Sequence, residues 1–229
     1  MSSKVHHRRT NVEELKTTST VLMDGTFEYC CQFFKQLFTI FIVKNGHYVP
    51  VLFCLLPNKT EATYECLFKK IRIMIGNDSL AEIMVDFEIA IHNALNKTWP
   101  RADIFGCRFH LTQSWFRKVQ NLGLATVYRS PDINNVEEQE ASKWLHRIFG
   151  LPFLSPEDVG TCFVEDFMTS IPQGQKFARY ADYLVENYIE EESKFPPKMW
   201  ASFTKNHVTT NPCESFHSRF KKKLLPCSP

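Results

Sequence analysis

The sequence TVLMDGTFEY, at residues 20–29, places one acid, Asp24, inside an apolar segment that is typical of a β-strand. A charged carboxylate in such a segment is costly to bury unless it meets a partner, a metal ion or a reacting group. Asp24 is therefore the first candidate site residue. A local alternative is that Asp24 and Gly25 form a two-residue hairpin turn, because Asp-Gly is a strong hairpin signal.

A second acid follows a second apolar segment. In LAEIMVDFEIAIHNAL, at residues 80–95, an apolar run leads into Asp86 and a helical pattern begins after it. Sites in open α/β sheets form at the ends of strands, and two carboxylates there can bind a divalent cation of the magnesium type. The alternative is that Asp86 only caps the helix that begins near Glu88.

The composition indicates a globular protein with a substantial core. The chain has 229 residues, of which 44% are hydrophobic and 14% aromatic, enough for one large domain or for a core with an insertion. No apolar run reaches membrane-spanning length, and the first residues lack the apolar segment of a secretory signal. We therefore expect an intracellular protein whose eight cysteines are reduced thiols.

The formal net charge is only +2, but basic residues gather near both ends of the chain, at Lys4, Arg8, Arg9, Arg219, Lys221, Lys222 and Lys223. Clusters of this kind can contact the phosphate backbone of a nucleic acid. Short charge runs are also common on solvated faces and tails, so the clusters alone do not decide between these interpretations.

Hydrophobic periodicity predicts a mixed α/β sheet of five strands with flanking helices over residues 20–111. We expect strands at 21–27, 33–43, 48–56, 82–85 and 103–108, and helices at 60–74 and 88–97. The first three strands form a meander through the Asn-Gly turn at 45–46. This order of elements is typical of a single mixed sheet.

The remainder of the chain is predicted to be helical. Helices are expected at 113–122, 136–149 and 176–189, within an all-helical insertion over residues 112–205. A final helix over 206–223 returns to the core, and residues 1–19 and 224–229 are expected to be tails. In the final helix, Asn211 and Glu214 fit an N-cap and its partner three residues later, which explains both without any chemistry.

Together, Asp24, Asp86 and Glu214 provide the carboxylates that two-metal phosphoryl transfer requires. With these motifs the sequence resembles the MULE (Mutator-like element) transposases, which have a ribonuclease-H-like DDE core. The matching segments are LMDGTF at 22–27, KNGHYVP at 44–50, MVDFEIAI at 84–91, CRFH at 107–110, KFPPKMW at 194–200 and TTNPCESFHSRFK at 209–221. One departure is Pro212, where many relatives have a second asparagine.

The resemblance implies that Asp24, Asp86 and Glu214 are the catalytic residues and bind two divalent cations, magnesium or manganese. The implied reaction is cleavage of a DNA strand at transposon ends by water, followed by attack of the freed 3'-hydroxyl on target DNA. It also implies a homo-oligomer in the nucleus, with Arg219 and Lys221–Lys223 as DNA contacts. Relatives usually carry an N-terminal DNA-binding module, which we do not expect here.

The resemblance also assigns Cys107 and His110 to a C-x2-H motif that supports the active site. An alternative is a structural zinc site completed by Cys213 and His217. Glu88 is interpreted as a helix-dipole residue. The competing functions are a non-catalytic DNA- or protein-binding protein derived from a transposon, and a ribonuclease-H-like nuclease acting on RNA–DNA hybrids. The helical insertion disfavours the second.

Overall fold

The computed structural model describes residues 4–6, 9–26, 33–76 and 80–202, without the side chains of residues 4–6 and 9–10. The chain divides into two compact units at the boundary between Cys107 and Arg108. The first unit contains a β-sheet with helices, and the second is helical throughout its described residues. Each unit is treated by itself below.

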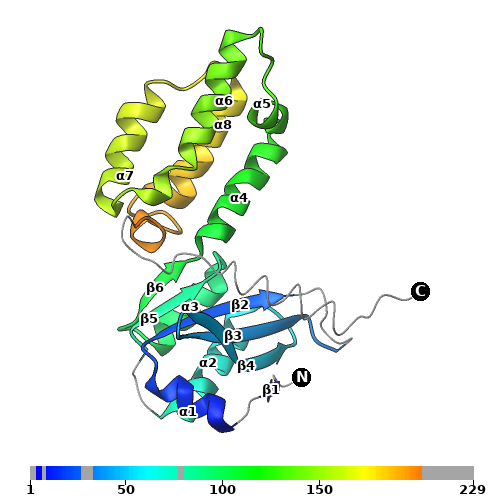
Figure 1. Cartoon of the computed structure of the whole chain (residues 1–229), viewed down its shortest axis with the longest axis vertical. Helices are drawn as coiled ribbons and strands as arrows, with labels where there is room; N and C mark the ends of the chain where they lie inside the picture. Colours follow the sequence, from blue (N-terminus) through cyan, green and yellow to red (C-terminus); the bar gives the residue numbers. More distant parts are fainter. Residues whose placement is uncertain (1–3, 7–8, 27–32, 77–79, 203–229) are drawn as a thin grey trace, which may run out of the picture. The chain divides into compact units, whose positions relative to one another are not determined.

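The sheet of the first unit has six strands in the order β1-β4-β3-β2-β5-β6 (Figure 1). The strands are β1 (Lys4–His6), β2 (Thr20–Thr26), β3 (Gln36–Lys44), β4 (His47–Leu56), β5 (Glu82–Val85) and β6 (Asp103–Gly106). Strands β2, β3 and β4 form an antiparallel meander, whereas β5 and β6 run parallel to β2. The five strands from β2 to β6 confirm the predicted mixed sheet, whose strand order fits a ribonuclease-H-like fold.

The turn between β3 and β4 has the chemistry expected of a two-residue hairpin. Asn45 and Gly46 both have positive φ angles, 51° and 75°, which the type I′ turn requires. Asparagine and glycine tolerate this conformation better than other residues. The Asn-Gly turn predicted from the sequence is therefore confirmed.

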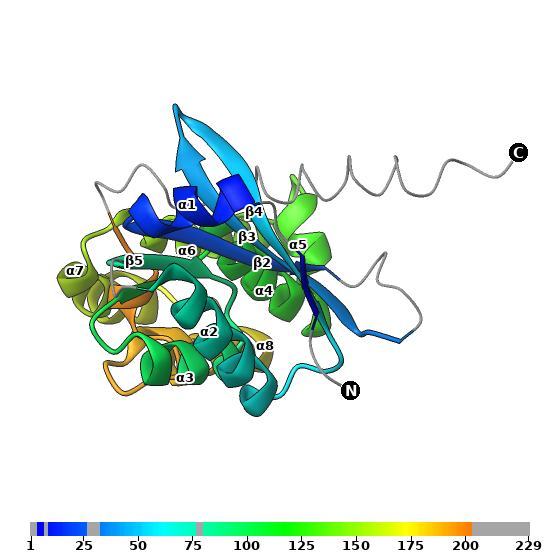
Figure 2. The same cartoon turned by 90° about the horizontal axis from the view of Figure 1, so that it is seen from below.

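Among the described residues, the first unit has three helices: α1 (Arg9–Thr17), α2 (Glu61–Ile75) and α3 (Ile89–Thr98). The N-cap of α2 is Thr60, whose side chain accepts a hydrogen bond from the Thr63 amide, and the helix ends at Gly76 with φ of 70°. A threonine N-cap and a glycine in the left-handed conformation are typical start and stop signals of a helix. Helices α2 and α3 lie side by side in the first unit (Figure 2).

The two faces of the sheet pack against different partners. Val21 and Met23 of β2 belong, with Ile83 and Val85 of β5, to a large core that includes the buried faces of α2 and α3. The alternate residues Leu22 and Met84 belong with Phe41 of β3 to a separate, smaller cluster. Because successive side chains point to opposite faces of a strand, this division tells us which face each neighbouring residue occupies.

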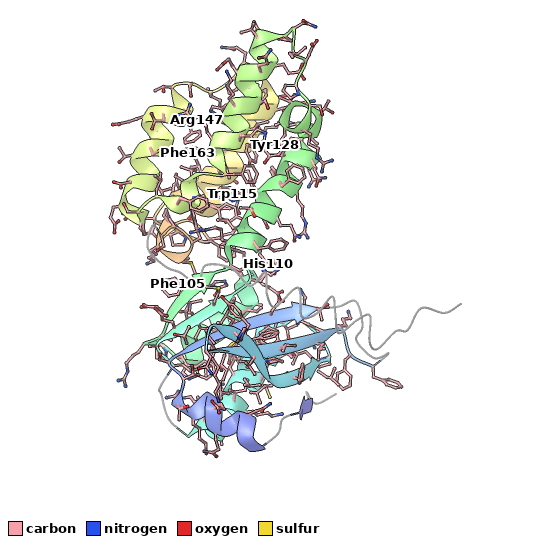
Figure 3. The ribbon with its side chains drawn as sticks, viewed as in Figure 1. Phe105, His110, Trp115, Tyr128, Arg147 and Phe163 are labelled. Atoms are coloured by element: carbon pink, nitrogen blue, oxygen red, sulfur yellow. The ribbon has the colours of Figure 1, made fainter. Side chains whose placement is uncertain are left out.

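The second unit contains α4 (Arg108–Asn121), α5 (Ala125–Arg129), α6 (Val136–Ile148), α7 (Pro156–Cys162) and α8 (Gln175–Leu184). It also contains the short helices η1 (Leu151–Phe153), η2 (Phe163–Met168), η3 (Val185–Ile189) and η4 (Pro197–Met199), of which η2 and η3 are π-helical. Trp115 is fully buried in this unit (Figure 3). Its ring makes edge-on contacts with Phe149, Tyr188 and Trp200, with centroids 5.5 to 5.9 Å apart.

Several element boundaries differ from the sequence prediction. The segment 1–19 was expected to be a tail, but it contains β1 on the sheet edge and α1 with Val12 and Leu15 in the core. Strand β6 ends at Gly106, and helix α4 begins at Arg108, earlier than predicted. Helices α5 and α7 were not predicted, because such short segments carry little periodicity. The predicted final helix lies outside the described residues, among which no helix is long and apolar enough to span a membrane.

Candidate active site

Asp24 lies inside strand β2, where it is 5% exposed. It pairs across the antiparallel ladder with Thr39 of β3. The hairpin alternative for Asp24 and Gly25 is therefore wrong, because both residues are within the strand. Side chains alternate along a strand, so Asp24 faces the same side as Leu22, two positions earlier. This is the face of the sheet opposite α2 and α3.

The glycine after Asp24 has a packing reason. A Cβ atom on Gly25 would lie 1.8 Å from the Nε2 atom and 2.8 Å from the Cδ atom of Gln36. The side-chain amide of Gln36, which is 2% exposed, therefore lies directly against the backbone of β2. Close approach of a neighbouring side chain is a recognised use of glycine in a strand.

Asp86 directly follows β5, which ends at Val85, whereas Asp24 lies within β2. The parallel ladder pairs Leu22 with Met84, and each acid follows its paired residue by two positions. Neighbouring strands are about 4.8 Å apart, and equal offsets from a paired position keep the same face. If the register continued one step past β5, Asp86 would face the same side as Asp24, and the convergence of the two acids stays a prediction.

The backbone at Asp86 is held by two hydrogen bonds. Its Oδ1 atom accepts from the Phe87 amide at 2.6 Å, and its carbonyl oxygen lies 2.8 Å from Nε2 of His92. Because a carbonyl can only accept, Nε2 carries the proton. Burial lowers the pKa of His92, and this effect exceeds the opposite effect of Asp86. The lowered pKa favours the neutral ring. His92 therefore contacts a candidate site residue.

The capping alternative for Asp86 is wrong. Helix α3 begins at Ile89, and the residue in the N-cap position is Glu88, which makes no side-chain capping bond. Instead, Oε2 of Glu88 lies 2.8 Å from the Lys59 ammonium and Oε1 lies 3.0 Å from the Tyr64 hydroxyl. Glu88 thus makes two specific contacts at the N-terminus of α3, and its interaction with the helix dipole stays a prediction.

Tyr64 of α2 connects Glu88 to Gln36. Its hydroxyl lies 2.9 Å from Oε1 of Gln36 as well as 3.0 Å from the Glu88 carboxylate. The residue is fully buried, and burial, followed by the negative charge of Glu88, raises the pKa of the Tyr64 phenol well above its ordinary range. The hydroxyl is therefore neutral at all physiological pH values and can donate a hydrogen bond.

Cys107 and His110 were predicted as supporting residues. Cys107 is fully buried, and its amide donates to the Val85 carbonyl at 2.8 Å, which continues the pairing with the strand that leads to Asp86. His110 lies in the first turn of α4, with its ring edge-on to Phe109 at 5.6 Å (Figure 3). The two residues fall in different units, and their supporting role stays a prediction.

Several predicted site residues lie outside the described residues: Glu214, Arg219, Lys221, Lys222 and Lys223, and the zinc candidates Cys213 and His217. Within the described ranges, no group of three or more His, Cys, Asp or Glu side chains could hold a metal ion. The structure therefore describes two members of the predicted triad, Asp24 within β2 and Asp86 just after β5, and both the triad and the zinc site stay predictions.

The oxygen atoms near Asp24 fit a hard cation. Thr39 is fully buried, and its hydroxyl has no hydrogen-bond partner among the described residues. It stands opposite Asp24 in the ladder, where paired Cα atoms are about 4.5 to 5.5 Å apart. Carboxylate and other oxygen ligands are those that magnesium prefers. The donor set at this position is thus of the right chemical kind for the cation that the resemblance implies.

Thr39, Gln36 and Tyr64 were missed by the sequence prediction. Each of them lies in an element whose apolar pattern gives no sign of a functional residue. Thr39 and Gln36 belong to β3, and Tyr64 belongs to the buried face of α2. The only signal was the polarity of Gln36 and Thr39 at buried strand positions. Polar residues at such positions need partners, and this requirement could have marked both residues as candidates.

Comparison with known proteins gives two results. No curated protein matches the chain. The family model described as the MULE transposase domain matches residues 20–114, which include β2 to β6, Asp24, Asp86, Cys107 and His110. This match confirms the resemblance drawn from the motifs, and it identifies residues 20–114 as similar to the MULE transposase domain, with a transposase-related function.

Proposed function

We propose that the chain is the catalytic part of a MULE-type DDE transposase, which cleaves DNA and transfers the cut strand in a metal-dependent reaction. The observation that supports the proposal is the parallel pairing of β2 with β5, because Asp24 and Asp86 each follow the paired residues Leu22 and Met84 by two positions, Asp86 just beyond the end of β5. These two acids lie within the segment that matches the MULE transposase domain. Glu214 is proposed as the third acid.

In this proposal Asp24 and Asp86 bind two divalent cations, magnesium or manganese. Such a pair of cations activates an attacking oxygen and stabilises the leaving oxygen of a phosphodiester. The buried position of Asp24 keeps water away from its carboxylate, which strengthens its interaction with a cation. The His92 contact fixes the Asp86 carbonyl, and the Phe87 amide orients the Asp86 carboxylate.

The other proposed properties follow from the reaction. The substrates are the transposon ends and the target DNA, with the basic residues near Arg219 as phosphate contacts. Strand transfer at two ends calls for a homo-oligomer, and access to chromosomal DNA calls for the nucleus. These properties rest on the family resemblance rather than on any contact in the described residues.

The test is nicking of supercoiled plasmid DNA by the purified chain with magnesium or manganese. Asp86→Asn should abolish the metal-dependent nicking, because a neutral amide binds a divalent cation poorly. The matched control is Asp103→Asn, the same chemical change at an exposed position at the beginning of the neighbouring strand β6. That variant should nick DNA like the wild type.

Three outcomes would contradict the catalytic proposal. Nicking that survives Asp86→Asn would mean that the activity comes from elsewhere or from a contaminant. A folded wild-type chain that binds DNA but never nicks it, with either metal, would favour the non-catalytic binding protein. A chain that cleaves RNA–DNA hybrids but not duplex DNA would favour the ribonuclease-H-like alternative.

A further inference from the structure

We propose that Tyr64 is a positioning residue that couples the two acid-bearing strand ends through helix α2. The inference rests on the proposed function, because it concerns the spacing of Asp24 and Asp86 at that same site. Tyr64 lies on the helix-covered side of the sheet, whereas the alternation places Asp24 on the opposite side. Tyr64 therefore acts through its neighbours and does not itself bind the cations.

The coupling begins on the Asp86 side at Glu88. This residue follows Asp86 by two positions, and its Oε1 atom lies 3.0 Å from the Tyr64 hydroxyl. Phe87 lies between these two residues, and its ring packs directly against Gly106 of β6. A Cβ atom added to Gly106 would lie only 2.1 Å from this ring. The segment that carries Asp86 is thus fixed on one side by β6 and on the other by Tyr64.

On the Asp24 side, the coupling passes through Gln36. Its Oε1 atom lies 2.9 Å from the Tyr64 hydroxyl, and its amide group lies against Gly25, the residue next to Asp24. Any movement of Tyr64 therefore shifts the amide that supports the backbone beside Asp24. One phenol links the two strand segments whose separation sets the distance between the acids.

The protons determine the direction of this chain. A phenol has one proton, and the stronger acceptor is the Glu88 carboxylate, so Tyr64 donates to Glu88. Oε1 of Gln36, 2.9 Å from the hydroxyl, is the second acceptor for the same proton, while Nε2 of Gln36 faces Gly25. One hydroxyl thus lies between an acceptor beside Asp24 and an acceptor beside Asp86.

Tyr64 has a rigid anchor for this role. Its ring contacts Phe38 at 5.7 Å and stacks on Phe68 at 6.1 Å between centroids, and it is fully buried. Both oxygens of Glu88 are engaged, one by Lys59 and one by Tyr64. Glu88 is therefore part of the support rather than a ligand of the proposed cations.

The test compares two buried tyrosines in the full chain. Tyr64→Phe removes a hydroxyl that has two partners, whereas Tyr180→Phe removes one that has no hydrogen-bond partner within the described part of the chain. Manganese binding is measured by calorimetry. The binding that is lost in Asp86→Asn is taken as binding at the proposed site. The manganese concentration for half-maximal nicking and the thermal midpoint are measured on the same preparations.

We expect Tyr64→Phe to raise the manganese Kd by about 10- to 100-fold, as loss of an outer partner does at other metal sites. Tyr180→Phe should leave the Kd unchanged. The manganese concentration for half-maximal nicking should rise with the Kd. A Tyr64→Phe protein that is less stable but binds manganese like the wild type would overturn the inference, because its hydroxyl would then have only a structural role.

Glu88→Gln separates support from direct binding. Glutamine keeps an acceptor for Tyr64, so the Kd should change far less than in Asp86→Asn; a loss as large as that of Asp86→Asn would make Glu88 a ligand and overturn its assigned role. If Tyr64→Phe does not fold, Gln36→Met removes the contact between Gln36 and Tyr64 instead. An unchanged manganese Kd in Gln36→Met would then overturn the inference. Absence of any Asp86-dependent manganese binding in the wild type would refute the proposed function itself, and this inference with it.

Discussion

Gly25→Ala should destabilise the first unit by forcing the Gln36 amide away from strand β2. The added Cβ would lie 1.8 Å from Nε2 and 2.8 Å from Cδ of Gln36, so the side chain cannot stay where it is. Gln36 is 2% exposed, and its displaced amide cannot reach water without further rearrangement. The 2.9 Å contact between Gln36 and Tyr64 would be lost as well.

The expected cost is about 3 kcal/mol. Overpacking of a tight site typically costs about 1 to 3 kcal/mol. Leaving a buried polar group without its partner costs about 1 to 3 kcal/mol more. Replacing glycine by alanine returns about 0.4 to 1 kcal/mol, because the unfolded chain loses conformational freedom.

The assay is urea denaturation, with hydrogen exchange on peptides from β2 and β3 as the local measurement. A local probe is needed because a chain with two compact units need not unfold in one step. The control is a double-mutant cycle with Gln36→Ala, which removes the obstructing amide. If Gly25→Ala destabilises β2 equally with and without the Gln36 side chain, the proposed clash is not the cause.

Three further predictions concern other buried groups. Trp115→Ala should destabilise the helical unit by about 3 to 5 kcal/mol, because three edge-on ring contacts are lost, while exchange protection in β2 stays unchanged. Trp144→Phe should cost about 1 to 3 kcal/mol in urea denaturation, because its indole N–H donates to the buried Phe167 carbonyl at 3.0 Å. At pH 8 a thiol reagent should label exposed Cys66 but not Cys54, whose pKa burial raises to about 12; rapid native labelling of Cys54 would contradict its burial.

The Cys54 shift also predicts the sign of a pH effect. Burial favours the neutral thiol in the folded state, so the folded pKa lies above the unfolded value of about 8.5. This contribution to stability is complete below pH 8.5 and is lost as the pH rises towards about 12. Cys54→Ala should reduce the alkaline loss of stability, as measured by thermal unfolding at a series of pH values.

The sequence predicted the sheet well because its signals are local and strong. Asn45-Gly46 can form the turn that its strands need, and the Thr60 cap and Gly76 stop bracket α2. Asp24 and Asp86 could be chosen as candidate site residues because each ends or interrupts an apolar strand. The pairing of their strands could not be read from the spacing along the chain, because strand register follows from long-range contacts.

The failures have physical causes too. Asp24-Gly25 has the composition of a turn, but the packing of Gln36 against Gly25 explains the glycine instead. The segment 1–19 is polar overall, yet Val12 and Leu15 suffice to dock α1 on the core. Tyr64 fits a buried helical stripe, and no local pattern reveals that its hydroxyl has two polar partners.

The parallel pairing of β2 with β5 has a consequence for which changes in chain length the fold can tolerate. The ladder pairs Leu22 with Met84, each two positions before an acid, so lengthening the loop after α2 would leave this offset unchanged. Insertion of one residue between Leu22 and Asp24 would instead turn the acid to the helix-covered face, because side chains alternate along a strand. Related chains should therefore vary in length between the two strands but not within them.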